Sequence, residues 1–305
     1  MSVLSKFFKA ASGDNYCVRT GLKSLSGTAE VILSVDVEKD MRVRKKIEIA
    51  NGVNLSDTRL KHLDIMDEYK SSLLNGNNTT LDKVISGENS NAERYVHRLV
   101  DALYYINVHA PSFDSISFAL QTASNKYDER IEGAQVNRLA ALMRLSEASD
   151  IINAAVNGFY LSYMDLFSSD NDSIARIVMK WWIGVPGLQL STAIQRHEKE
   201  YVHCLMVCSE EKDGVLNITP FYDFMRDMIE EACDSFIRIT EPLDGMQTTL
   251  VQKIKEQSRA YLTVGEASTI LGEDETAAKK VLDSLCESGY MELDPNTDKY
   301  KSLWK

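Results

Sequence analysis

Near the N-terminus, apolar side chains recur at every second position of the chain. This spacing runs from Val31 to Val37, and it is the period of a half-buried strand. Residues 38–40 can turn the chain, and the apolar residues between 43 and 49 mark a second strand. The pattern therefore predicts a β-hairpin region at residues 1–54.

From residue 55 onward the apolar positions lie three or four residues apart, which is the period of an amphipathic helix. Ser56 is the predicted N-cap of a helix that ends near Leu74, and Ser90 with Glu93 forms a capping box. The sequence predicts a helical body at residues 55–240. Its later helices are predicted from Asn171 to Gly184, from Ser191 to Cys208 and from Thr219 to Ile239.

The longest apolar stripe lies in a proline-free stretch and runs from Ile116 to Phe159 in steps of three and four. One continuous helix of this length would extend over roughly 65 Å, further than the other predicted helices could cover. An uncovered stripe would forgo the free energy of burial, so we predict that a second chain packs on it. The predicted interface residues on this stripe are Leu120, Tyr127 and Ile131. Trp181 and Trp182, beside a Gly-Pro break, are predicted to anchor either the core or an interface.

After an expected linker at residues 240–245, the pattern changes to short elements. Residues 246–305 predict a helix, a short strand, two further helices and a terminal hairpin, which is the order of a winged helix. The predicted fold class is therefore mainly α. It comprises an N-terminal β-hairpin region, a helical body with one very long helix and a C-terminal winged-helix-like module.

Charge argues against a nucleic-acid partner. The chain has 34 Lys and Arg against 45 Asp and Glu, a net charge of −11, and such a field repels phosphate backbones and anionic lipid. The second helix of the winged-helix pair begins with three consecutive acids at residues 273–275, where base readout would need Arg, Asn or Gln. For the basic run at residues 42–46 we prefer a solvated strand edge to nucleic-acid binding. A DNA-binding regulator is the third interpretation of function.

The sequence offers little for cofactor or metal chemistry. Five cysteines without CxxC spacing indicate a reducing compartment, and no stretch of 18 apolar residues predicts a membrane span. Glu200 and His203 form a single ExxH, whereas a di-iron bundle needs a second one. Cys204 and Cys208 fit buried structural thiols better. We therefore predict no catalytic residue, no cofactor, no metal site and no membrane partner.

Residues 165–176 read DLFSSDNDSIAR. They resemble the Fic-fold motif His-x-Phe-x-acid-Gly-Asn-Gly-Arg-x-x-Arg at Phe167, Asn171 and Arg176. Asp165 stands in the place of the catalytic histidine, Asp170 and Asp172 replace the glycines that would cradle phosphates, and Ser173 replaces the first arginine. The resemblance implies an inactive or divergent Fic-fold transferase.

Residues 95–210 also resemble virion-associated structural proteins of tailed bacteriophages. The similar stretch is QVNRLAALMRLSEASDIINAAVNGFYLSYM at 135–164, followed by a break at Pro186 and the helix AIQRHEKEYVHCL. This resemblance implies a non-enzymatic assembly protein of a phage tail, baseplate or neck. Such a protein would be made in the cytoplasm, incorporated in the virion, and would contact other protein subunits as a homo-oligomer or in a larger assembly. We take this as the leading prediction and the Fic-fold transferase as the alternative.

Overall fold

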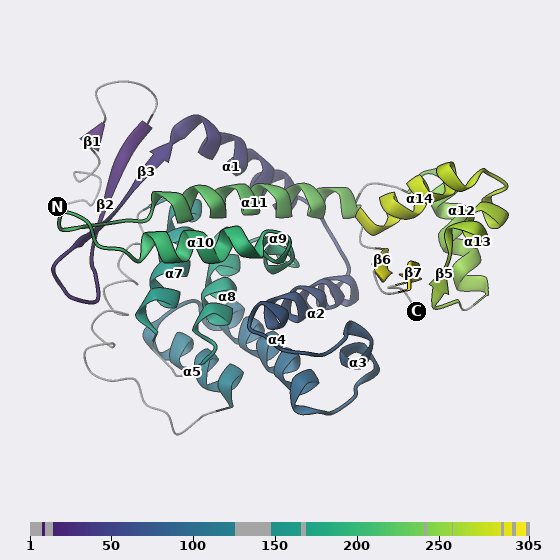
Figure 1. Ribbon diagram of the computed structural model, residues 1–305, viewed down its shortest axis with the longest axis horizontal. Helices are drawn as coiled ribbons and strands as arrows, with labels where there is room; N and C mark the ends of the chain where they lie inside the picture. Colours follow the sequence, from purple (N-terminus) through teal and green to yellow (C-terminus); the bar gives the residue numbers. More distant parts are fainter. Residues whose placement is uncertain are drawn as a thin grey trace. The chain divides into compact units, whose positions relative to one another are not determined.

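The computed structural model describes residues 8–9, 15–125, 148–165, 169–240, 243–257, 259–287, 290–294 and 297–302. The chain forms two compact units, residues 1–233 and residues 234–305, which are described separately below. Helices account for most of the described residues (Figure 1). The predicted mainly α fold class is confirmed.

The first unit contains a four-stranded sheet in the order β1 (Phe8–Lys9), β2 (Asn15–Lys23), β3 (Glu30–Asp36) and β4 (Val215–Asn217). Strands β2 and β3 are antiparallel neighbours, and β4 joins β3 in parallel from a distant part of the sequence. The strand predicted from Val31 to Val37 is therefore present as β3. Its hairpin partner precedes it in the chain, whereas we had expected the partner to follow.

The second predicted strand is wrong, because residues 37–51 form a helix, α1 (Val37–Asn51). Asp36 caps this helix by accepting a hydrogen bond from the Lys39 amide at 3.1 Å. The buried apolar residues of α1 follow the helical steps of four and three: Val43, Ile47 and Ala50. The basic run at residues 42–46 therefore does not protect a strand edge.

Two members of that basic run form ion pairs with another helix. Arg42 Nη2 lies 2.7 Å and Lys46 Nζ 2.8 Å from the carboxylate of Glu230, on α11 (Thr219–Thr240). The run thus attaches α1 to α11. At the start of α11, the Thr219 hydroxyl accepts a hydrogen bond from the Ser34 amide of β3 at 2.9 Å.

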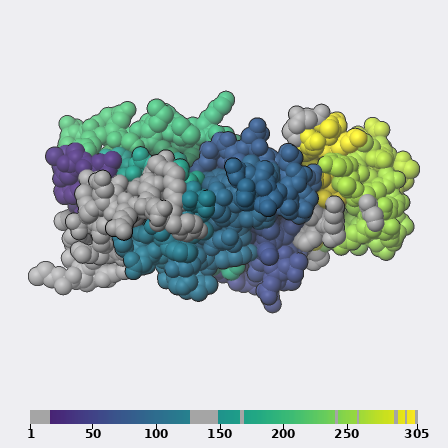
Figure 2. Space-filling view, turned by 90° about the horizontal axis from the view of Figure 1, so that it is seen from below, coloured from purple at the N-terminus to yellow at the C-terminus, as the bar shows by residue number. Residues whose placement is uncertain are grey.

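The helical body confirms the predicted local start signals. Ser56 caps α2 (Asp57–Leu74), and the capping box of Ser90 and Glu93 opens α4 (Asn91–His109). The short helix α3 (Leu81–Ser86) lies between them, and the side chains of α3 and α4 form the middle of the face shown in Figure 2. Within the described part of the chain, no helix is both long enough and apolar enough to cross a membrane.

The prediction of a single very long helix is wrong. Helix α5 (Phe113–Ser124) ends at Asn125, which has a left-handed backbone with φ of 56°. A separate helix, α7 (Asp150–Met164), begins at an N-cap formed by Ser149. Both helices bury their apolar stripe within this chain, so the length argument for a second subunit no longer holds.

The helix predicted from Ser191 to Cys208 is also divided. It consists of α9 (Leu190–Arg196) and α10 (Glu198–Cys208), which meet at His197. Tyr201 of α10 packs against Phe221 and Phe224 of α11, with ring centroids 6.1 and 6.0 Å apart. These contacts place α10 alongside α11, as Figure 1 shows.

Helix α7 is the apolar centre of the first unit, because nearly all of its residues are buried. It packs against α8 (Asn171–Ile183) (Figure 1). The two helices approach closely at Gly158, where an added methyl group would lie 2.3 Å from Met179 Sδ. A side chain at this position would therefore push the two helices apart or displace Met179.

Replacing Gly158 by alanine is expected to lower the free energy of unfolding by about 1–3 kcal/mol, although alanine is the better helix former, because the added methyl overpacks the interface. Chemical denaturation measures the loss. In the double variant Gly158→Ala, Met179→Ala the added methyl group has room. The double variant should therefore lose less free energy of unfolding than the sum of the losses of the two single variants. Strict additivity would contradict the close approach.

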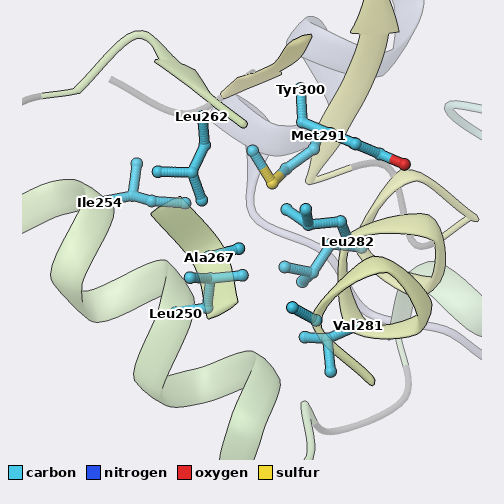
Figure 3. Close-up of a cluster of buried hydrophobic side chains, with 10 residues drawn as sticks. Leu250, Ile254, Leu262, Ala267, Val281, Leu282, Met291 and Tyr300 are labelled. Atoms are coloured by element: carbon cyan, nitrogen blue, oxygen red, sulfur yellow. The ribbon is translucent and has the colours of Figure 1, made fainter. Parts of the chain in front are cut away.

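The second unit has the predicted order of elements. It contains α12 (Gly245–Glu256), β5 (Tyr261–Leu262), α13 (Val264–Leu271), α14 (Glu275–Glu287), β6 (Met291–Asp294) and β7 (Lys299–Ser302). Its strands form a sheet in the order β5-β7-β6. Figure 3 shows side chains from all three helices and all three strands that meet in one core, among them Leu250, Ala267, Leu282 and Tyr300. The winged-helix interpretation of this unit stays a prediction.

Candidate active site at the α7–α8 junction

The Fic-like sequence lies where α7 ends and α8 begins. Asp165 terminates α7 with φ of 45°, and Asp170 precedes α8 with φ of 70°. Both values fall in the left-handed region that glycine adopts most easily and that Asp tolerates. Asp170 stands where the motif has its first glycine. The backbone at this position therefore has a glycine-like conformation although the side chain has changed.

Asp165 and Asn171 face each other across the junction. The Asn171 Nδ2 group donates a hydrogen bond of 2.9 Å to Asp165 Oδ1. Asn171 is buried in the first turn of α8, whereas Asp165 is exposed. The contact orients the Asp165 carboxylate and leaves it accessible to solvent, which is the arrangement a general base requires.

Asp170 is held by one side chain from outside the motif and by its neighbour Ser169. Its Oδ1 accepts a hydrogen bond of 2.5 Å from the Tyr95 hydroxyl of α4, and its Oδ2 accepts one of 2.6 Å from Ser169. Burial, together with the negative charge of Asp170, raises the pKa of Tyr95 well above its usual value. Tyr95 therefore remains a neutral donor that ties the loop to α4.

Arg176 has a structural position rather than an exposed one. Its guanidinium is buried, and it donates to Ser71 Oγ at 3.0 Å and to the Ser71 carbonyl at 3.1 Å. It also donates to Asn75 Oδ1 at 2.8 Å and to Ser173 Oγ at 3.2 Å. This arginine thus joins α8 to α2, and its donors are used within the protein.

Opposing charges set the electrostatics of the junction. The N-terminus of α8 carries the partial positive charge of a helix dipole, which favours an anion. Asp165, Asp170 and Asp172 place three carboxylates within the same eight residues. They weaken the attraction for a phosphate group. The site therefore differs in charge from a glycine-lined phosphate cradle.

Of the predicted interface residues, the structure describes Leu120, Trp181 and Trp182. Leu120 is only 1% exposed and packs inside the chain, so its assignment to an interface is wrong. Trp181 and Trp182 are half-buried, with ring centroids 5.0 Å apart in an edge-to-face arrangement. Tyr127 and Ile131 lie outside the described residues, as does the motif residue Phe167.

The histidine and cysteine residues around α10 do not form a metal site in the described part of the chain. Glu200 and His203 are both exposed to solvent, whereas Cys204 and Cys208 are buried. Burial raises the pKa of the Cys208 thiol to about 11. This thiol is therefore protonated at neutral pH and packs as a small apolar side chain.

Sequence reasoning missed Ser71, Asn75 and Tyr95, which complete the site. They come from α2, from the residue that follows α2, and from α4, and they contact the motif about 75–105 residues away in sequence. Each is an ordinary polar residue in its own segment. Only the packing of α2 and α4 against α8 shows that they belong together.

Comparisons with known proteins identify a structural neighbour. A crystal structure of a Fic family protein from Desulfovibrio desulfuricans G20 superposes with a TM-score of 0.58 and 15% sequence identity. The similarity covers 89% of this chain and 98% of that protein. No family model matches the sequence, and no curated protein matches it. The shared feature is the fold.

This neighbour changes two predictions. It supports the resemblance to Fic-fold proteins and gives no support to the phage structural role. It also contradicts the prediction that the chain is not an enzyme, because the Fic resemblance implies a transferase. That prediction followed from the phage resemblance and from the lack of a known catalytic constellation in the sequence.

Proposed function

We propose that this protein is a divergent Fic-fold transferase that moves a nucleotidyl group from a nucleoside triphosphate to a hydroxyl group of a protein. The observation that carries the proposal is the structural similarity to a Fic family protein, which covers most of the length of both chains. Support also comes from the α7–α8 junction, where Asn171 and Arg176 keep their motif positions.

The proposed chemistry assigns the proton to Asp165. The acceptor hydroxyl attacks the α-phosphorus, the bond from that phosphorus to the bridging oxygen breaks, and pyrophosphate leaves. Asp165 takes the hydroxyl proton, since its carboxylate is exposed and oriented by Asn171. Asn171 is the positioning residue in this scheme. The carboxylates at Asp170 and Asp172 make the site a weak binder of the triphosphate.

Incubation of the full chain with ATP labelled at the α-phosphate is expected to label protein, whereas a γ-phosphate label is not transferred. Asp165→Asn keeps an oxygen that can accept from Asn171 but cannot take a proton. This change is expected to lower the labelling rate by about 100-fold or more. Gel autoradiography of the two labels measures the outcome.

A substitution in the other direction provides the matched test. Asp170→Gly removes a carboxylate at a backbone with φ of 70°, where glycine is at ease, and is expected to increase labelling by easing triphosphate binding. Asp213→Gly makes the same change at φ of 52° outside the site and should leave labelling unchanged. Absence of α-label on both the wild type and folded Asp170→Gly would refute the proposal. Transfer of the γ-label would refute the nucleotidyl assignment.

A further inference from the structure

A separate cavity lies at the other end of α8, away from the α7–α8 junction. It has a volume of about 300 Å³, at the lower end of the range for small-molecule sites. Its walls come from α2, α4, α8 and the loop of residues 184–188, all within the first unit. These three helices pack against one another (Figure 1). The cavity therefore lies among packed helices and is partly open to solvent.

The polar groups beside the cavity belong to a buried ion cluster. Lys180 Nζ lies 2.8 Å from Asp67 Oδ2 and also bonds Glu68. Asp67 accepts further hydrogen bonds from the Thr192 amide at 2.8 Å and the Ser191 amide at 3.2 Å. Lys180 is thus committed to two carboxylates, although it lines the cavity.

Asp64 is the carboxylate that lines the cavity itself. It is half-buried one helical turn before Asp67 and Glu68, and its side chain bonds the Tyr104 hydroxyl of α4. The carboxyl groups of Asp64, Asp67 and Glu68 lie near the one ammonium group of Lys180. Burial raises the pKa of Asp64 to about 6, against the opposing effect of Lys180. With a pKa of about 6, Asp64 is mainly ionised at neutral pH and places a negative charge at the cavity wall.

The other side chains that line the cavity include an indole, an aliphatic group and an amide. Trp181 of α8 and Leu103 of α4 line the cavity, and Asn107 lies at its exposed rim. Indole faces attract cations, and an amide oxygen accepts their hydrogen bonds. An anion would face Asp64, and a purely apolar ligand would remove water from that carboxylate without adding a hydrogen bond to the one from Tyr104.

We propose that this cavity binds a small organic cation, a primary amine with a short apolar body, through Asp64, Trp181 and Asn107. An ammonium group has three donors, which suit the carboxylate of Asp64 and the amide of Asn107. The apolar body packs against Leu103 and Trp181. The site is distinct from the proposed transferase centre, and binding there requires no nucleotide.

Phenethylamine is the test ligand, and 2-phenylethanol is its uncharged counterpart of similar shape. Calorimetry on the full chain without nucleotide is expected to show that the amine binds at least about tenfold more tightly than the alcohol. Tryptophan fluorescence should change on binding, because Trp181 lines the cavity. Asp64→Asn should bring the two affinities to within about twofold of each other while circular dichroism stays unchanged.

The matched control is Asp101→Asn, which removes an exposed carboxylate of α4 outside the cavity lining. It should keep the preference for the amine. Trp181→Leu is the second variant and should weaken the amine more than the alcohol, since it removes the indole face. Equal binding of both ligands by the wild type, or no binding of the amine up to about 10 mM, would overturn the proposal. So would a preference that survives Asp64→Asn. None of these outcomes depends on nucleotidyl transfer.

Discussion

Replacing Lys180 by alanine is expected to lower the free energy of unfolding by about 3–5 kcal/mol. The Lys180 side chain is only 6% exposed, and it is the partner of Asp67 and Glu68, which are buried as well. Removal of the ammonium group leaves two carboxyl groups in a medium of low polarity without their cation. The cost comes mainly from these stranded groups, and chemical denaturation at neutral pH measures it.

A lysine in an exposed ion pair provides the control. Lys212 Nζ lies 3.0 Å from Glu210 Oε2, with the lysine side chain 74% exposed. Lys212→Ala should change the free energy of unfolding by less than about 1 kcal/mol, because water already solvates both partners. Similar losses for Lys180→Ala and Lys212→Ala would mean that burial does not decide the effect.

The loss on Lys180→Ala should depend on pH. Burial raises the pKa of Glu68 from 4.5 to about 7 even with Lys180 beside it, and removal of the cation raises it further. Between the unfolded and folded pKa values the folded state binds the extra proton, so its stability falls as the pH rises. The deficit of the variant should therefore be smaller at pH 5 than at pH 7.5. An equal deficit at both pH values would contradict the stranded-carboxyl explanation.

Local signals in the sequence were sufficient to place several elements. Ser56 and the Ser90–Glu93 pair each mark a helix start through residues that are neighbours in the chain. Such caps act within one turn, so the sequence pattern carries the whole interaction. The short elements of the second unit were predictable for the same reason.

Errors arose where two local patterns compete. Residues 37–51 fit a strand at some positions, but Val43, Ile47 and Ala50 also fit a helix, and the cap at Asp36 decides for the helix. The stripe from Ile116 to Phe159 kept its period while the chain left the helix at Asn125 and began a new one after Ser149. A hydrophobic period shows which face is buried, not whether the backbone is continuous.

The candidate site shows a different limit. Asp165, Asn171 and Arg176 lie within twelve residues, so the motif could be located from the sequence. Its partners Ser71 and Tyr95 are distant in the chain and give no signal of their own. The ion cluster of Lys180 with Asp67, 113 residues apart, was unpredictable for the same reason.

Arg176→Ala is expected to lower the free energy of unfolding by about 3–5 kcal/mol, a loss as large as that for Lys180→Ala. The guanidinium is fully buried and donates to Ser71, Asn75 and Ser173. Truncation leaves these polar groups without their donor and opens a cavity between α2 and α8. Arg176→Lys should also destabilise the fold, because an ammonium group cannot reproduce the planar fork of donors.

A variant of the exposed Arg42, which pairs with Glu230, is the control that separates the effect of burial on stability from the effect of charge. Arg42→Ala removes an equal charge from a side chain that is 56% exposed and should leave the free energy of unfolding nearly unchanged. The comparison also determines how the proposed activity is tested. Loss of nucleotidyl transfer in Arg176→Ala would reflect unfolding as much as chemistry, so Asp165→Asn is the informative variant. If Arg176→Ala unfolds at the same denaturant concentration as the wild type, Arg176 does not hold α8 to α2, and its donors are available to a bound phosphate.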